Sequence, residues 1–262
     1  FCKEAEERLT DAGITLLVDS KVERILGEDS VTGVRLEDGR ELKADMVILG
    51  IGAVPSTSLA KDAGIELGSR NSIKVDNYMR TWTDPDIFAC GDCAEKRSFF
   101  TGLPIGVMLA SIATSEARIA GANLFSPVHQ HCGAISVFST MINGRAFAVA
   151  GLTERNARKN GMNIVIGTAE APDTHPAGMP NSNMTKVKLI FAKETGVILG
   201  GSVSGGRSAG EMINVLSACI IHRMTADDIV KFQMGTHPAL TSSPIAYPIV
   251  NAACRASLPI RS

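Results

Sequence analysis

The sequence lacks the features that mark several classes of protein. Basic residues do not exceed acidic ones, because 26 Lys and Arg stand against 27 Asp and Glu and leave a formal charge of −1. The chain therefore has no cationic surplus to neutralise a nucleic-acid backbone or an anionic membrane. No apolar run reaches the roughly 18 residues of a transmembrane helix, since polar residues interrupt even 103–120. We expect a soluble protein that binds neither nucleic acid nor a membrane.

Cysteine is also scarce. Six cysteines in 262 residues fall far short of the density of a disulfide framework, which favours a reducing compartment and predicts a cytoplasmic protein. The first residues are Phe1-Cys2-Lys3, without an initiator Met or the profile of a signal peptide, so the chain is expected to be a piece of a longer one. The remaining composition, 45% hydrophobic and 20% charged, is that of a globular protein and excludes disorder.

The first half is predicted to alternate helices with short strands. Continuous apolar runs at 45–52 and 87–90 predict strands buried on both faces of an α/β sheet. Pro104 is expected to open a helix that runs to about Leu124, because proline is tolerated in the first helical turn. Periodicity predicts further helices at 3–12 and 58–63, strands at 14–18, 21–26, 31–36 and 41–43, and a hairpin turn at 37–40.

Beyond residues 125–132 the pattern changes to hairpin strands followed by helices. This order is typical of an α+β domain, and it places a domain junction near 125–132. The predicted strands are 134–138, 145–151, 163–168, 185–191 and 196–203, the helices are 153–160, 208–222, 225–232 and 246–256, and 172–183 is a loop.

The motif most specific for chemistry is the segment 83–92, TDPDIFACGD. A strand that ends in Gly91-Asp92 puts a carboxylate at the sheet edge where open α/β folds bind ligands, and Asp92 would accept hydrogen bonds from ligand hydroxyls. The helix expected after Pro104 would start near the same edge, where its free N–H groups favour an electron-rich or anionic ligand group. Taken alone, Gly-Asp after a strand is more often a simple turn.

Four stretches together carry a resemblance to a known family. They are VTGVRLEDG at 31–39, ADMVILGIGAVP at 44–55, LAKDAGIEL at 59–67 and IFACGD at 87–92. These stretches resemble the flavin-dependent pyridine nucleotide-disulfide oxidoreductases, and within them most of all the NADH oxidases and coenzyme A-disulfide reductases. The resemblance implies an α/β fold with partial FAD- and NAD(P)-binding sheet domains, followed by an α+β dimerisation domain.

The resemblance also implies a division of the chain and an activity. Residues 1–50 would be the end of the NAD(P)H-binding domain, 51–128 the second segment of the FAD-binding domain, and 129–262 the C-terminal dimerisation (interface) domain. In the intact enzyme, a homodimer, electrons would pass from NAD(P)H through FAD to a disulfide, a persulfide or dioxygen. The residues alone leave the acceptor open, and likewise the choice between NADH and NADPH.

The cofactor-binding residues follow from the same resemblance. Gly91 and Asp92 would hold the ribityl chain of FAD. Leu103, Pro104 and Ile105 would lead into a helix whose N-terminus faces the pyrimidine ring of the flavin.

Several parts of the family pattern are absent. No G-x-G-x-x-G stands between a strand and a helix, and the glycine-rich stretch 200–206 has the wrong spacing. Both dinucleotide fingerprints and the redox cysteine would lie upstream of Phe1, so this chain alone is expected to be inactive. Residues 53–56 (AVPS) stand where relatives tend to carry Arg-Pro-Asn. The alternative function is a non-catalytic dimerisation module.

The loop at 235–247 contains the two candidate catalytic residues, His237 and Tyr247. In relatives a His-Pro at this place reaches across the dimer to the partner's redox centre, and a Glu after it orients the imidazole. Residues 241–243 are Thr-Ser-Ser and supply no such carboxylate. We therefore expect His237 to position or hydrogen-bond rather than act as a strong acid-base, with Tyr247 hydrogen-bonding near a sulfur substrate. A purely loop-shaping role for His237 is the alternative.

Two other clusters are better explained by structure than by chemistry. Cys90 and Cys93 have the spacing of a redox pair or half a zinc site, but a structural zinc needs a second ligand pair, so packing is favoured. His129, His131 and Cys132 have metal-like spacing in a linker without an obvious fourth partner. We predict no metal site.

Overall fold

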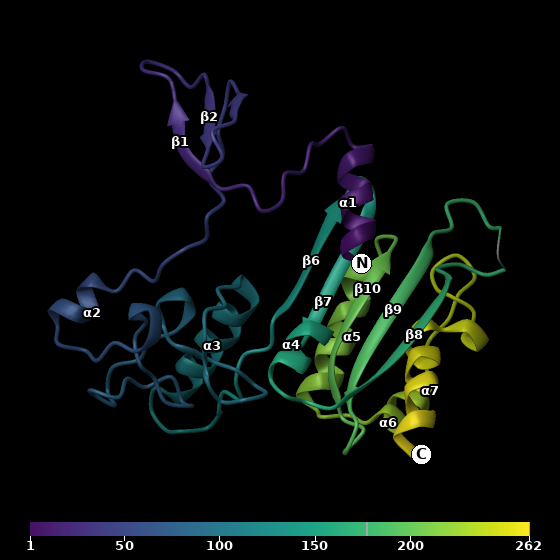
Figure 1. Cartoon of the computed structure of the whole chain (residues 1–262). Helices are drawn as coiled ribbons and strands as arrows, with labels where there is room; N and C mark the ends of the chain where they lie inside the picture. The colour runs from purple at the N-terminus through teal and green to yellow at the C-terminus, as the bar shows by residue number, and fades with distance from the viewer. Residues whose placement is uncertain (177, 262) are drawn as a thin grey trace.

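The computed structural model describes residues 1–176 and 178–261, which form two parts of different architecture (Figure 1). The N-terminal part contains small sheets and helices, and the C-terminal part contains a five-stranded sheet covered by helices. Within the described ranges no helix combines the length and the apolar character needed to cross a membrane.

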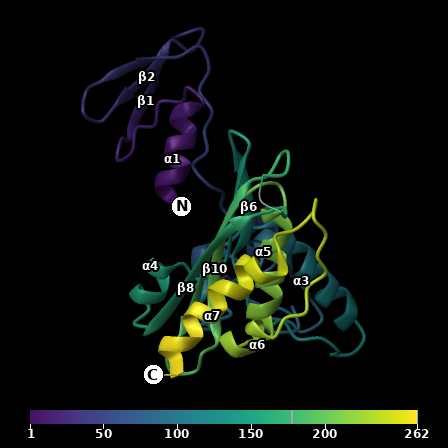
Figure 2. The same cartoon turned by 90° about the vertical axis from the view of Figure 1, so that its right-hand side faces the viewer.

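The C-terminal part is an antiparallel sheet in the order β6-β7-β10-β9-β8. Helix α5 packs on β7 and β10, while α7 packs on β8 and β9 and also contacts α6 (Figure 2). The strands are β6 (Val137–Ile142), β7 (Arg145–Gly151), β8 (Ile164–Pro172), β9 (Met184–Ala192) and β10 (Ile198–Gly205), and the helices are α4 (Glu154–Lys159), α5 (Ala209–Ile221), α6 (Ala226–Val230) and α7 (Pro248–Arg261).

Two glycines, one on β8 and one on β10, allow α7 and α5 to approach one face of the sheet closely. Gly167 on β8 pairs with Leu189 on β9, which pairs with Gly201 on β10. A Cβ on Gly167 would lie 1.9 Å from the carbonyl oxygen of Ala252 in α7, and one on Gly201 would lie 2.8 Å from Leu216 in α5. The helices therefore rest directly on the strands, and the main hydrophobic core lies between the two layers.

The elements predicted for this half are confirmed to within a few residues. The hairpin between β6 and β7 turns at Asn143 and Gly144, both with positive φ. Thr153 caps α4 through the backbone N–H of Asn156. Thr225 and Asp228 form a reciprocal capping box at the start of α6, which fixes where that helix begins.

The N-terminal part begins with α1 (Cys2–Asp11) and a three-stranded antiparallel sheet, β1-β2-β3. The predicted helix at 3–12 and the turn at 37–40 are confirmed, with Gly39 at φ +87° in the turn. The remaining elements are β1 (Val22–Leu26), β2 (Gly33–Leu36), β3 (Glu41–Lys43), α2 (Ser58–Asp62), β4 (Lys96–Arg97), β5 (Pro104–Ile105), α3 (Ala110–Asn123) and 3₁₀ turns at Ser69–Asn71, Gly91–Cys93 and Pro244–Ala246.

Three predicted strands are wrong. Residues 14–18 and 45–52 form no ladder, and apolar side chains such as Met46 and Ile51 are 75% and 88% exposed. Residues 87–90 make a single bridge, between Phe88 and Arg80, instead of a strand. An apolar run becomes a buried strand only where neighbouring strands and helices cover it, and the described residues supply none along 45–52.

The helix predicted from Pro104 begins later, at Ala110. Pro104 and Ile105 instead pair with Arg97 and Lys96 in a short two-stranded ladder. Proline fits there because the missing N–H is tolerated at a strand edge. The helix N-terminus is therefore set by Leu109, whose backbone is extended, and not by the proline.

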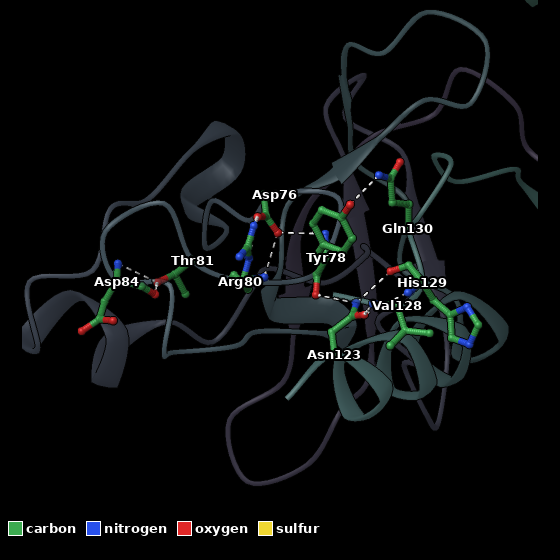
Figure 3. A network of polar contacts seen from close by, with 9 residues as sticks. All are labelled: Asp76, Tyr78, Arg80, Thr81, Asp84, Asn123, Val128, His129 and Gln130. Carbon is green, nitrogen blue, oxygen red and sulfur yellow. Dashed lines mark hydrogen bonds and ion pairs between the residues drawn. The ribbon is translucent and has the colours of Figure 1, made fainter. Parts of the chain in front are cut away.

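A buried asparagine ties the end of α3 to the linker and to the loop 76–84 (Figure 3). The amide nitrogen of Asn123 donates to the carbonyl oxygens of Tyr78 at 3.1 Å and His129 at 2.8 Å. The amide oxygen of Asn123 accepts from the backbone N–H groups of Val128 at 2.8 Å and His129 at 3.0 Å. One side chain therefore fixes the path by which the chain leaves the N-terminal part.

Candidate functional site

Asp92 lies in the middle of a single 3₁₀ turn, Gly91–Cys93. Gly91 has φ +77°, a conformation that glycine adopts without strain and that turns the chain sharply after residue 90. The Asp92 side chain is exposed, and no other described residue hydrogen-bonds to its carboxylate. The carboxylate is thus free to accept hydrogen bonds from a ligand.

The structure brings Asp92 together with only part of the predicted site. A narrow cavity beside Asp92 is lined by Arg70, Lys96, Ile105 and Met108, among others. Ile105 therefore lines the same cavity as Asp92. The side chain of Leu103 is 65% exposed and Pro104 is exposed, and neither lines this cavity.

The start of α3 lies close to the turn. A Cβ on Gly91 would be 3.7 Å from the Cβ of Ala113 in the first turn of the helix. The first N–H groups of a helix have no intrahelical partner and carry a partial positive charge. A free carboxylate, an apolar contact and a helix start at one place fit a ligand that has hydroxyl groups and an electron-rich end.

Beneath the turn lies a buried ion pair that the sequence did not reveal. The Lys96 and Glu116 side chains are 3% and 1% exposed, with Nζ 2.9 Å from Oε2. The N–H of Gly91 donates to the same Oε2 at 2.8 Å. The Lys96 ammonium donates to the carbonyl oxygen of Gly91 and, at 2.9 Å, to that of Ala94. No sequence signal pairs these two residues, because they are 20 positions apart and one lies in an otherwise ordinary helix.

The other predicted residues lie elsewhere in the chain. The loop between α6 and α7, which contains His237, is on the opposite side of the molecule from α3 in Figure 1. His237 is exposed, and its Nδ1 accepts from the N–H of Ala239 at 3.2 Å. Tyr247 is half-buried against the main core, and this burial raises the pKa of its hydroxyl. Within one chain, therefore, neither residue meets Asp92.

The loop with His237 is anchored by a second histidine. The backbone N–H of His175 donates to the carbonyl oxygen of Pro238 at 2.9 Å, and Nδ1 of His175 lies 2.9 Å from the carbonyl oxygen of Thr241. The hydroxyl of Thr241 accepts from the N–H of His237 at 3.1 Å. Thr241, in the stretch 241–243 that supplies no carboxylate, thus shapes the loop backbone.

In the cysteine cluster, the surroundings of the Cys90 thiol are those of a packed side chain. Burial, and next the neighbouring Cys93, raise the pKa of the Cys90 thiol, the opposite of what a reactive thiolate needs. Cys93 donates instead to the carbonyl oxygen of Cys90 at 3.3 Å. Among residues 1–176 and 178–261 no group of three or more His, Cys, Asp or Glu side chains is arranged to hold a metal ion.

Two family models match the sequence, one over each part. Residues 1–117 match the model described as pyridine nucleotide-disulphide oxidoreductase, and residues 137–245 match the dimerisation domain of the same family. The chain belongs to the pyridine nucleotide-disulphide oxidoreductase family. The resemblance found in the sequence is confirmed, and so is the expected class of fold, a mixed α/β part followed by an α+β dimerisation domain.

Individual members of the family resemble the chain over nearly its whole length. An NADH oxidase of Methanocaldococcus jannaschii is 28% identical over 90% of this chain and 52% of its own length. A CoA-dependent NAD(P)H sulfur oxidoreductase of Pyrococcus furiosus is 28% identical over 86% of this chain and 50% of its own. The crystal structure of reduced CoADR-RHD from Bacillus anthracis, 27% identical, covers 98% of this chain and 45% of its own, with a TM-score of 0.89. The chain spans about half the length of the curated relatives it matches.

Proposed function

We propose that this chain is the C-terminal portion of an FAD-dependent NAD(P)H oxidoreductase. Residues 1–50 would close the NAD(P)H-binding domain, 51–128 would form the second segment of the FAD-binding domain, and 129–262 would form the dimerisation domain. The family membership and the span of about half the relatives' length support this assignment. The observation that carries it is the free Asp92 carboxylate beside the start of α3.

In this proposal Asp92 accepts hydrogen bonds from the hydroxyls of the ribityl chain of FAD. Gly91 gives the turn that presents the carboxylate, and Ile105 makes an apolar contact beside it. The first turn of α3, rather than Pro104, directs N–H groups at the electron-rich end of the flavin. FAD, when bound, supplies the hydride and electron chemistry, while the chain binds and orients it.

The electron acceptor would be dioxygen or a sulfur species. Relatives with similar identity carry the names NADH oxidase and CoA-dependent NAD(P)H sulfur oxidoreductase. Both acceptors fit a site in which flavin is the electron donor. Turnover of the full-length protein with coenzyme A disulfide, with polysulfide and with dioxygen distinguishes them.

We further propose a homodimer in which His237 and Tyr247 act on the partner subunit. The match of residues 137–245 to a dimerisation domain and the distance of the His237 loop from α3 support this arrangement. His237 would position or hydrogen-bond, since no carboxylate follows it in 241–243. In the intact enzyme His237→Gln should lower turnover by less than ~10²-fold, the loss typical of a true general acid-base.

The absorption spectrum of the purified full-length protein tests the flavin assignment. We expect flavin bands with about one FAD per chain. Absence of flavin, together with failure to bind added FAD, would favour the alternative of a non-catalytic dimerisation module. The isolated 262-residue chain is expected to bind FAD weakly or not at all, because it has no glycine-rich loop for the pyrophosphate.

A further inference from the structure

The ion pair beneath Asp92 is hard to explain as a source of stability. Lys96 and Glu116 are both almost wholly buried, and burying two charges costs about as much as their attraction returns. Moreover, Oε1 of Glu116 is buried without a hydrogen-bond partner in the described residues. An apolar pair of similar volume would stabilise the fold at least as well. The charges therefore need another explanation.

That explanation lies in what the pair holds. Gly91 has no side chain, and glycine adopts positive and negative φ with similar ease. Neighbouring atoms do not restrict it either, since even an added Cβ would make only an ordinary contact of 3.7 Å with Ala113. The directions of the two peptides that flank Gly91 are thus fixed by hydrogen bonds. The N–H of Gly91 donates to Glu116, and its C=O accepts from the Lys96 ammonium as well as from the N–H of Ala94 at 3.0 Å.

We propose that the Lys96–Glu116 pair is a positioning device that clamps both polar groups of Gly91 and so sets where the adjacent Asp92 carboxylate points. The pair does not touch the ligand itself and acts through Asp92. The proposal rests on the proposed function, in which Asp92 binds the ribityl hydroxyls of FAD. It gives a role to a buried carboxylate that has one oxygen without a partner among the described residues.

The geometry also defines how the clamp can be tested without leaving a buried charge. Removing only one member would strand the other charge and destabilise the protein for reasons unrelated to Asp92. Two charge-free double variants avoid this problem. In Lys96→Met/Glu116→Gln an amide oxygen can still accept from the N–H of Gly91, whereas in Lys96→Met/Glu116→Leu nothing replaces that acceptor. The two variants therefore have the same charge and differ in whether the N–H of Gly91 has an acceptor at position 116.

The dissociation constant of FAD, measured by flavin fluorescence on the deflavinated full-length protein, provides the test. We expect the Leu variant to bind FAD at least about tenfold more weakly than the Gln variant, with a shift of the bound flavin's visible bands toward those of free flavin. Equal affinities and equal spectra in the two variants would overturn the proposal. Asp92→Ala serves as the separate control: if it leaves FAD binding unchanged, the proposed function itself fails, whatever the clamp variants do.

Hydrogen exchange of the wild-type protein gives a second measurement that needs no variant. A clamped Gly91 N–H is expected to exchange at least tenfold more slowly than the N–H of the exposed Asp86 in the preceding loop, which donates to the side chain of Asp84. Exchange of Gly91 at the same rate as Asp86 would show that the pair does not hold the turn, and the proposal would be wrong.

Discussion

Replacing Asn123 by Ala should loosen the connection between the two parts of the chain. The substitution removes four hydrogen bonds, from one amide group to Tyr78, Val128 and His129 (Figure 3). At about 1 kcal/mol net for each bond, the upper limit of the loss is about 4 kcal/mol. Three of the four backbone groups belong to the exposed residues Val128 and His129 and can regain water. We therefore expect a loss of about 2–3 kcal/mol in the free energy of unfolding.

Urea unfolding followed by fluorescence measures this loss, because the single tryptophan, Trp82, lies in the N-terminal part. Asn123→Asp sharpens the test, since it keeps an acceptor for the two N–H groups but turns a carboxylate oxygen toward two carbonyl oxygens, and it should cost at least as much as Ala. Asn163→Ala is the matched control, because the exposed side chain of Asn163 donates one hydrogen bond within the described residues, to Glu194. A loss below about 0.5 kcal/mol for Asn123→Ala, equal to the surface control, would refute the reasoning.

Three further predictions concern packing, pH and thiol reactivity. Gly167→Ala should destabilise the dimerisation domain by at least ~1–3 kcal/mol, because the new Cβ would lie 1.9 Å from the Ala252 carbonyl oxygen; an unchanged urea midpoint would contradict this. Burial lowers the pKa of His131 below 6.5, with Lys96 adding to this effect and Glu116 opposing it, so the folded state binds the proton less well than the unfolded state. The free energy of unfolding of the wild type should therefore fall between about pH 7 and pH 5 by more than that of His131→Asn. Stability curves of the two proteins that run parallel over this range would contradict the prediction. Burial raises the pKa of Cys219 to about 11, so iodoacetamide should label exposed Cys132 in the native protein and Cys219 only after unfolding, as mass spectrometry can check.

Local signals explain why the C-terminal half could be predicted from sequence. Several of its strands alternate buried and exposed residues, and the turn between β6 and β7 contains Asn143-Gly144. Thr225 and Asp228 form a capping box that marks the start of α6. These signals act within a few residues, so they do not depend on the rest of the chain. The close approach of α7 to β8 was not predictable, because the need for Gly167 appears only once Ala252 lies above it.

The N-terminal half was predicted less well because its elements depend on partners distant in sequence. The apolar run 45–52 has the composition of a buried strand, but a strand also needs neighbours to pair with, and none of the described residues pairs with it. Pro104 has the features of a helix start, but in the structure it pairs with Arg97 in a short two-stranded ladder. At the site, the Gly91-Asp92 turn was found from its motif, whereas the Lys96–Glu116 pair depends on a tertiary contact that carries no local signal.

The most direct test of the account is the affinity of the full-length protein for FAD with and without the Asp92 carboxylate. A charged hydrogen-bond acceptor contributes roughly 1.5–3 kcal/mol, so Asp92→Ala should weaken FAD binding by about 10- to 150-fold. Asp86→Ala, which removes another exposed carboxylate from the preceding loop, should leave the dissociation constant unchanged. An Asp92→Ala protein that binds FAD as tightly as the wild type would contradict the assignment of this turn as the flavin site.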